Sequence, residues 1–175
     1  SGDARRCYAG RGAVGWGPRL ERWGRVIAGL QATRPEGMQT ELFAFGRMPL
    51  ALSARCFTAR HYGLKKDSCE YRCLDHPDGI TLSTREGQEF LAINGIQTQS
   101  AQRYLLLDEM PAIAAAGLDA VRISPQSRHT PAIVAAFDAA RRGETVAADP
   151  AWSPEGFCNG YWHGRAGIEL ARRAA

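Results

Sequence analysis

The hydrophobic and polar positions of this chain follow strand-like patterns in some segments and helix-like spacing in others. The order of these segments predicts a fold class. Short extended runs rich in apolar residues cover residues 40–46, 88–96 and 119–124. Apolar residues at helical spacing cover residues 19–31, 103–116 and 130–143, and a short final helix is expected over residues 166–174. Strands that alternate with helices through short connections are typical of βα units on a parallel sheet. We therefore expect an α/β fold with a parallel sheet.

The length of the chain limits this prediction. The chain has 175 residues, whereas an eight-stranded βα barrel usually needs about 250 residues. Residues 1–28 contain several glycines and arginines that break both periods. We therefore expect an N-terminal segment over residues 1–28, followed by part of a βα barrel over residues 29–175.

Charge and apolar run lengths exclude several function classes. The net charge is +4, and the basic residues are scattered rather than clustered with aromatic residues, which argues against nucleic-acid binding. No apolar run approaches the roughly 18 residues of a transmembrane helix, so no transmembrane segment is expected. The first twenty residues hold arginines but no apolar stretch of a secretory signal, so the protein is expected to be cytoplasmic.

The cysteines are the strongest candidates for chemistry. Cys56, Cys69 and Cys73 lie within 18 residues, while Cys7 and Cys158 lie near the two ends. The neighbours of the three clustered cysteines are largely charged and polar, which fits poorly with packing in a core. Zinc would accept the three cysteines together with His61 or His76, and an iron–sulfur cluster would normally require a fourth cysteine. The spacing by itself leaves zinc and iron–sulfur open.

Four stretches of the chain resemble a known family. They are residues 45–60 (FGRMPLALSARCFTAR), 91–98 (LAINGIQT), 121–126 (VRISPQ) and 158–162 (CNGYW). Together they are similar to the collagenase-like peptidase family (peptidase clan U), over about residues 37–170. The resemblance implies a TIM-barrel-like fold, of which this chain carries the C-terminal half, with the N-terminal half apparently missing.

The same resemblance implies a cofactor, partners and a role. It implies a [4Fe-4S] cluster held by Cys56, Cys69 and Cys73, with a fourth ligand from the missing half. Cys7 and Cys158 are the remaining candidates for that fourth thiolate. The implied partners are a UbiU-like member of the family in a heterodimer, a sterol-carrier-like lipid-binding protein and a ubiquinone precursor. The implied role is oxygen-independent hydroxylation in ubiquinone biosynthesis, as a hydroxylase subunit rather than a peptidase.

Two other functions stay open, and no catalytic residue is assigned. The chain could be a peptidase-family hydrolase with a structural metal, or a truncated fragment with a structural Cys-zinc site. Asn94, Gln97 and Arg122 fall near predicted strand ends, which line the active face of a barrel, although Asn94 and Gly95 also fit a simple turn. Asp108 and Glu109 are expected on a solvated helix face.

Overall fold

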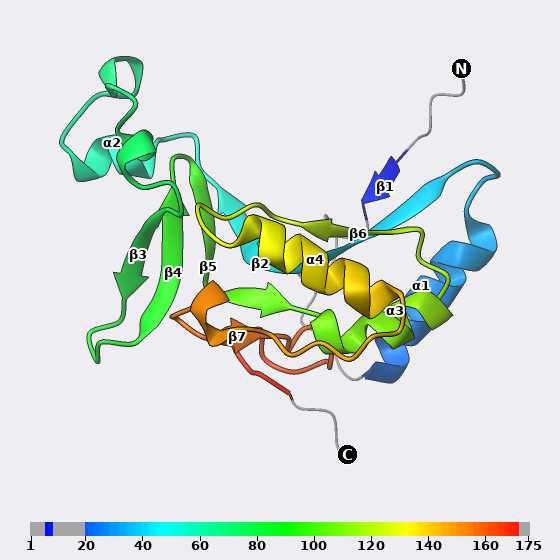
Figure 1. Ribbon diagram of the computed structural model, residues 1–175. Helices are drawn as coiled ribbons and strands as arrows, with labels where there is room; N and C mark the ends of the chain where they lie inside the picture. Colours follow the sequence, from blue (N-terminus) through cyan, green and yellow to red (C-terminus); the bar gives the residue numbers. More distant parts are fainter. Residues whose placement is uncertain (1–5, 9–19, 172–175) are drawn as a thin grey trace.

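The computed structural model describes residues 6–8 and 20–171. They form a mixed open sheet with helices packed on it (Figure 1). The strands are β1 (Arg6–Tyr8), β2 (Gln39–Leu52), β3 (Ile80–Ser83), β4 (Glu89–Asn94), β5 (Gln97–Leu105), β6 (Ala120–Ile123) and β7 (Phe157–Cys158). The α-helices are α1 (Leu20–Thr33), α2 (Phe57–His61), α3 (Met110–Ala115) and α4 (Thr130–Arg141). Short 3-10 helices are η1 (Lys66–Ser68), η2 (Arg72–Asp75), η3 (Leu107–Glu109) and η4 (Pro150–Trp152).

The prediction of a parallel, barrel-like sheet is wrong. The strand order is β1-β2-β5-β4-β3, with β6 beside β2 and β7 beside β5. The pairs β2–β5, β4–β5 and β3–β4 are antiparallel, while the pairings of β1 and β6 with β2 and of β7 with β5 are parallel. The α/β part of the prediction is correct, but the sheet is mostly antiparallel and open.

A tight turn after β4 is the physical reason for this difference. Asn94 pairs with Gln97 across a turn that contains Gly95 at φ 61°. Such a short connection joins only antiparallel strands, because a parallel neighbour needs a crossover of a dozen or more residues. The apolar pattern over residues 103–116 had predicted a helix. Residues 103–105 instead complete β5, and the α-helical part begins at Met110.

Strand β2 changes neighbours along its length. Residues 41–45 lie beside β6, and residues 45–52 lie beside β5. Gly46 sits at this change with φ 123°, and a Cβ atom there would lie 2.5 Å from Cβ of Ser124. Only glycine combines this backbone conformation with such a close approach. The register of β2 against β5 then shifts after Arg47, so the strand bends as it leaves the core.

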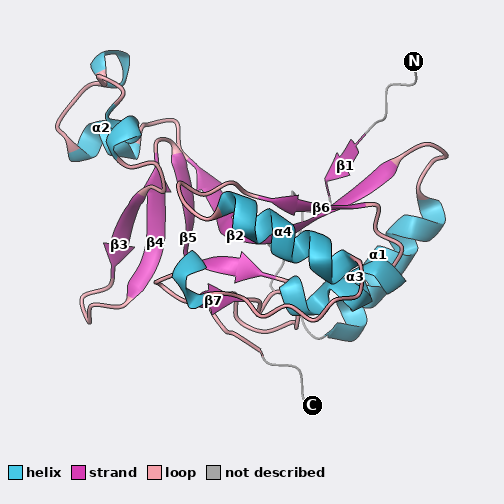
Figure 2. Ribbon diagram, viewed as in Figure 1, coloured by secondary structure: helices cyan, strands magenta, loops and turns pink. Residues whose placement is uncertain are grey.

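The core lies between the sheet and helices α3 and α4. Phe45, Leu106 and Ile133 are fully buried there. The ring of Phe45 meets those of Phe137 and Trp152 edge to face, at centroid distances of 6.3 and 6.4 Å. Figure 2 shows α4 lying across the sheet, whereas the short helical turns around α2 project beyond the ends of β3, β4 and β5.

The remaining expected elements agree with the structure in part. The predicted strands over residues 40–46, 88–96 and 119–124 correspond to β2, β4 and β6, although β2 is longer. Helices α1 and α4 match the predictions over residues 19–31 and 130–143. The final helix expected over residues 166–174 is not formed over residues 166–171, and residues 172–174 lie outside the described part. None of the described helices has the length and apolarity needed to cross a bilayer.

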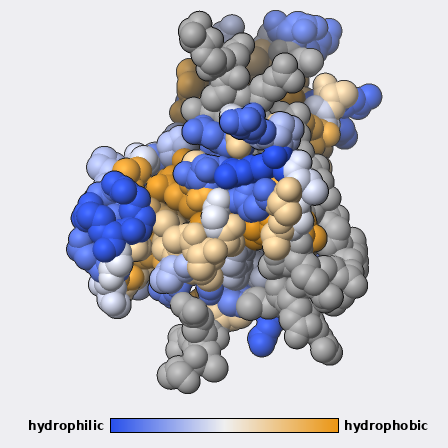
Figure 3. All heavy atoms as spheres, turned by 90° about the vertical axis from the view of Figure 1, so that its right-hand side faces the viewer, coloured by the Kyte–Doolittle hydropathy of each residue, from blue (hydrophilic) through white to orange (hydrophobic). Residues whose placement is uncertain are grey.

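The face of the molecule that bears α1 combines apolar and polar side chains. On α1, Ile27 is buried while Val26 is 55% exposed. Figure 3 shows apolar residues on this face, bordered by strongly polar ones. The neighbouring residues Val26 and Ile27 thus differ in exposure, as on an amphipathic helix.

Candidate functional site: the cysteine lobe

Residues 53–79, here called the cysteine lobe, carry the three clustered cysteines. Their base is fixed to the turn between β4 and β5. The Phe57 N–H donates to the Gly95 carbonyl at 2.8 Å, and the Gly95 N–H donates to Oγ1 of Thr58 at 3.1 Å. The Ser53 N–H donates to the Ile96 carbonyl at 2.8 Å. Thr58 is only 2% exposed, so this junction anchors α2 firmly to the sheet.

Cys56 begins the short helix α2. Its backbone is extended, and its Sγ atom accepts the Ala59 N–H at 3.4 Å, as an N-cap side chain does. The Cys56 side chain is half-buried and belongs to no disulfide. The cap bond orients this thiol with respect to the sheet through the docked helix.

Cys69 and Cys73 lie on the two short helical turns that follow. Cys69 ends η1 and Cys73 lies in η2, and both are free and half-buried. Between them, Glu70 and Tyr71 have φ values of 53° and 52°. Left-handed backbone in non-glycine residues costs roughly 1 kcal/mol per residue. The connection between the two cysteines is therefore held in a strained conformation.

Tyr62, which is 39% exposed, contacts three other side chains of the lobe. Its hydroxyl oxygen lies 2.6 Å from Nε2 of His76, and the Arg72 guanidinium lies 5.5 Å from its ring centroid. The His61 ring meets the same tyrosine edge to face at 5.1 Å. The two histidines considered as zinc ligands thus both contact Tyr62, and His76 uses Nε2 for that contact.

The structure does not arrange the three thiols as a metal site. Within the part of the chain that it describes, no group of three or more His, Cys, Asp or Glu side chains is placed to hold a metal ion. Cys56, Cys69 and Cys73 share one lobe, and α2 packs against η2. As a donor set three thiols suit a soft metal or an iron–sulfur cluster. As arranged here they do not fit one.

A buried ion-pair network fixes the other end of the lobe. Asp78 accepts the Ser127 N–H at 2.9 Å and the Ser127 hydroxyl at 2.6 Å, and it lies 3.6 Å from Arg103. Glu155 accepts Arg47 and Arg103 on its two carboxylate oxygens, each at 2.6 Å. The arginine side chains are 6% exposed. The lobe is thus tied to the core through side chains from five separate segments.

These contacts change the ionisation of both carboxylates. Burial opposes ionisation of Glu155, but a backbone hydrogen bond and the charges of Arg47 and Arg103 outweigh it and hold its pKa below the usual value. Burial also opposes ionisation of Asp78, while its hydrogen bonds from Ser127 and the Arg103 charge lower its pKa overall. Both groups are therefore stabilised as carboxylates.

The other candidate residues lie apart from the lobe thiols or have structural roles. Asn94 and Gln97 are the paired residues of the β4–β5 hairpin, so they form a turn rather than an active face. Arg122 donates from Nε to Glu41 at 2.7 Å across β6 and β2. The expectation of a solvated face is wrong for Glu109, which is 4% exposed and lies 3.0 Å from Nε2 of His163.

The two remaining cysteines differ from the lobe cysteines. Cys158 is 2% exposed on β7, and burial raises the pKa of its thiol to about 12. Such a thiol is costly to ionise and makes a poor thiolate ligand in this position. Cys7 lies in β1, opposite Thr40 of β2, and its side chain lies outside the described part.

Sequence reasoning missed the Arg47–Arg103–Glu155 network. Glu155 is 108 residues from Arg47 along the chain, and no motif connects the two residues. A hint was available, because Arg47 stands within an apolar run that extends over residues 42–52. A charged residue in such a run requires a partner.

No protein-family model matches the chain. No solved structure is significantly similar to it.

Proposed function

We propose that this protein is an iron–sulfur accessory protein for oxygen-independent hydroxylation in ubiquinone biosynthesis, similar to UbiV. It would act in the cytoplasm as a heterodimer with a UbiU-like protein. The observation that carries the proposal is the cysteine lobe, in which three free, half-buried cysteines lie on one projecting unit. The four stretches that resemble the collagenase-like peptidase family include this segment.

The placement of those stretches also supports the proposal. Residues 91–98 form the hairpin that receives α2, and residues 45–60 lead from the core into the lobe. Gln126, from the third stretch, accepts Nε of Arg103 at 2.5 Å, which belongs to the network that holds Asp78. Three of the four stretches thus contact the lobe or the network that supports it.

The proposal leaves the fourth ligand to the partner or to another part of the protein. Three thiolates are one short of the usual set for a [4Fe-4S] cluster. Cys158 is buried on the sheet and does not belong to the lobe. The proposal therefore requires that the heterodimer, rather than this chain by itself, is the form to test.

Anaerobic coexpression with the UbiU-like partner tests the proposal. We expect a brown complex in which this chain holds one cluster of about four iron atoms, measured as iron and acid-labile sulfide. Cys56→Ser, Cys69→Ser or Cys73→Ser should lower the iron assigned to this chain to background. Cys158→Ala is the matched control, because it removes a thiol outside the lobe and should leave the iron content unchanged.

Two outcomes would contradict the proposal. One tightly bound zinc per chain, lost in the same three variants, would indicate a structural Cys-zinc site instead. A complex that retains its iron when all three lobe cysteines are replaced would show that the lobe is not the ligand source. Peptidase activity in that triple variant would favour the hydrolase alternative.

A further inference from the structure

The most exposed large apolar side chains of the described residues gather at the cysteine lobe, which projects from the sheet (Figure 1). Leu74 is 78% exposed, Tyr71 is 74% exposed, and Leu52, which immediately precedes the lobe, is 75% exposed. Elsewhere in the described part, no large apolar side chain exceeds the 55% of Val26. Single exposed apolar residues are ordinary on a protein surface, but their concentration on one projecting unit indicates an interaction surface.

Tyr71 and Leu74 lie on one short turn and are here called the Tyr71–Leu74 pair. The Leu74 N–H donates to the Tyr71 carbonyl at 2.9 Å, and a 3-10 turn of this kind places residues three apart next to each other. Cys73 lies on the same turn. A molecule bound to the pair would therefore lie beside the Cys73 thiol.

The same turn carries two carboxylates, which narrow the class of partner. Glu70 and Asp75 lie 2.8 and 3.6 Å from the Arg72 guanidinium. An anionic lipid surface would repel both carboxylates, and insertion into a bilayer would remove their hydration. A protein surface can instead receive the two apolar side chains and leave the flanking ion pairs in water, as at the polar rim of an interface. The turn thus suits a protein partner better than a membrane.

The remaining charges of the lobe define the chemistry of that partner. Arg55, Arg60 and Lys65 are exposed, and their side chains form no ion pair with any other described residue. Of the four carboxylates in the lobe, three are paired with arginines of this chain, and Asp67 remains. Electrostatic complementarity therefore requires a partner surface that is acidic.

We propose that the Tyr71–Leu74 pair is the contact through which a second protein docks on the cysteine lobe. The partner surface has an apolar recess for these two side chains, bordered by carboxylates that face Arg55, Arg60 and Lys65. Tyrosine is enriched among the residues that contribute most to protein–protein binding. The inference rests on the proposed heterodimer for the identity of the partner, but not on any metal.

Binding of the UbiU-like protein to variants of the full chain tests the inference. Tyr71 has φ 52°, a left-handed conformation that asparagine adopts more readily than most residues, so Tyr71→Asn removes the ring and keeps the turn. We expect Tyr71→Asn to weaken binding about thirtyfold or more, as loss of a central aromatic contact does. Leu74→Ser should weaken it about tenfold. The iron content of the parent complex is measured in parallel.

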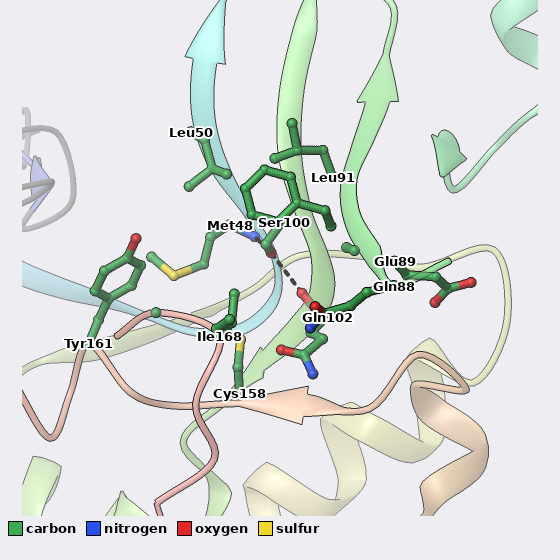
Figure 4. A pocket seen from close by; sticks show the side chains of 13 residues that line it. Met48, Leu50, Gln88, Glu89, Leu91, Ser100, Gln102, Cys158, Tyr161 and Ile168 are labelled. Atoms are coloured by element: carbon green, nitrogen blue, oxygen red, sulfur yellow. Dashed lines mark hydrogen bonds between the residues drawn. The ribbon is translucent and has the colours of Figure 1, made fainter. Parts of the chain in front are cut away.

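Ile168 provides a matched control away from the lobe. It is 51% exposed and lines an open pocket beside Cys158 and Tyr161 (Figure 4). This pocket uses the Glu89 end of β4, whereas the lobe is fixed at the Asn94 end. Ile168→Ser removes an exposed apolar side chain as Leu74→Ser does, and it should bind the partner like the parent.

The kinetics of binding test the charged part of the surface. The double variant Arg55→Gln/Arg60→Gln should lower the association rate constant severalfold at low salt and reduce its dependence on salt, with the dissociation rate nearly unchanged. Tyr71→Asn should instead raise the dissociation rate, because most effects of interface substitutions are in that rate. An association rate that is the same for the double variant and the parent would show that the partner surface is not acidic.

Four results would overturn the inference. Parent-like binding by both Tyr71→Asn and Leu74→Ser would place the interface elsewhere, and iron retained in that complex would leave the proposed function intact. A parent chain that does not bind the UbiU-like protein would refute both the docking surface and the proposed heterodimer. Self-association that Tyr71→Asn abolishes would assign the surface to a second copy. Binding to phosphatidylglycerol vesicles that Tyr71→Asn abolishes would assign it to a membrane.

The opposite combination separates the two proposals as well. Loss of binding in Tyr71→Asn, together with a parent complex that contains no iron, would support the docking surface and refute the iron–sulfur function.

Discussion

At the scale of single residues, the described cysteines occupy two kinds of environment. Cys56, Cys69 and Cys73 are half-buried in the lobe, whereas Cys158 is enclosed by the sheet. Because thiolates rather than thiols react and bind metals, burial separates a potentially functional group from a structural one. Composition could not make this distinction, because a count of cysteines does not say which of them are buried.

Thiol reactivity checks this assignment. In a Cys7→Ser background, we expect the three lobe cysteines to react with a disulfide reagent in the native protein at pH 7.5. Cys158 should react only upon unfolding. Its pKa of about 12 against an ordinary 9.0 reduces the thiolate fraction roughly a thousandfold. The measurement is the number of thiols released with time, with and without urea.

A control variant makes the result decisive. Cys158→Ala should remove the slow phase and leave the fast one unchanged. Fast reaction of four thiols in the native Cys7→Ser protein would contradict the burial of Cys158.

At the scale of elements, the junction of α2 with the β4–β5 turn determines where the lobe stands. The helix has five residues, too few to be stable in isolation. Its position therefore depends on the bonds that Phe57 and Thr58 make with Gly95. The sequence showed a turn at Asn94 and Gly95, but it gave no sign that this turn would receive a helix.

Replacing Thr58 tests the junction. Thr58→Val keeps the shape but leaves the Gly95 N–H without its acceptor, which should cost about 1–3 kcal/mol. We expect faster amide hydrogen exchange over residues 57–76, with exchange in β2 and α4 unchanged. Thr98→Val on the same hairpin is the matched control and should leave the lobe protected. Equal exchange in the parent and Thr58→Val proteins would show that other contacts hold the lobe.

At the scale of the whole molecule, the network around Glu155 joins segments that are distant in sequence. It connects β2 and β5 with the loop that follows η4 and, through Asp78, with the end of the cysteine lobe. If Glu155 were neutral, the buried Arg47 would lose its carboxylate partner and Arg103 would keep only Asp78, at 3.6 Å. Removing one partner of a buried ion pair lowers the free energy of unfolding far more than removing one partner of an exposed pair.

Replacement of Glu155 should therefore destabilise the protein strongly. We expect Glu155→Gln to lower the free energy of unfolding by about 3 kcal/mol in urea titrations at pH 7. Glu144→Gln is the matched control, because Glu144 pairs with Arg142 on the exposed surface, and it should change stability by about 0.5 kcal/mol or less. Similar stabilities for the two variants would contradict the role given to the network.

The same network predicts how stability depends on pH. Glu155 and Asp78 have lower pKa values in the folded protein than usual, so the folded state binds fewer protons than the unfolded state in acid. Their contribution is fully present above about pH 4.5 and is lost as the pH falls through the folded values. The urea midpoint should decrease between pH 5 and pH 3, and less steeply for Glu155→Gln. Equal slopes would assign the acid sensitivity to other groups.

The sequence by itself determined the local features of this protein. Residues 39–46 and 130–141 follow their predicted periods, because each pattern places apolar side chains on one side of a segment. The three clustered cysteines share a lobe because only 18 residues of chain contain them. Such features depend on neighbours in the sequence, which is why they could be predicted.

Only the tertiary structure decided the direction of the strands, the placement of the thiols and the burial of Cys158 and Glu109. Periodicity indicates which side chains are buried, but not which strand pairs with which. The sheet was therefore predicted to be parallel, whereas the structure shows it to be mostly antiparallel. The partners that decide ionisation, such as Glu155 for Arg47, come from remote parts of the chain. These pairs act because the fold brings their side chains close together, and the sequence around each residue does not indicate which remote residue that will be.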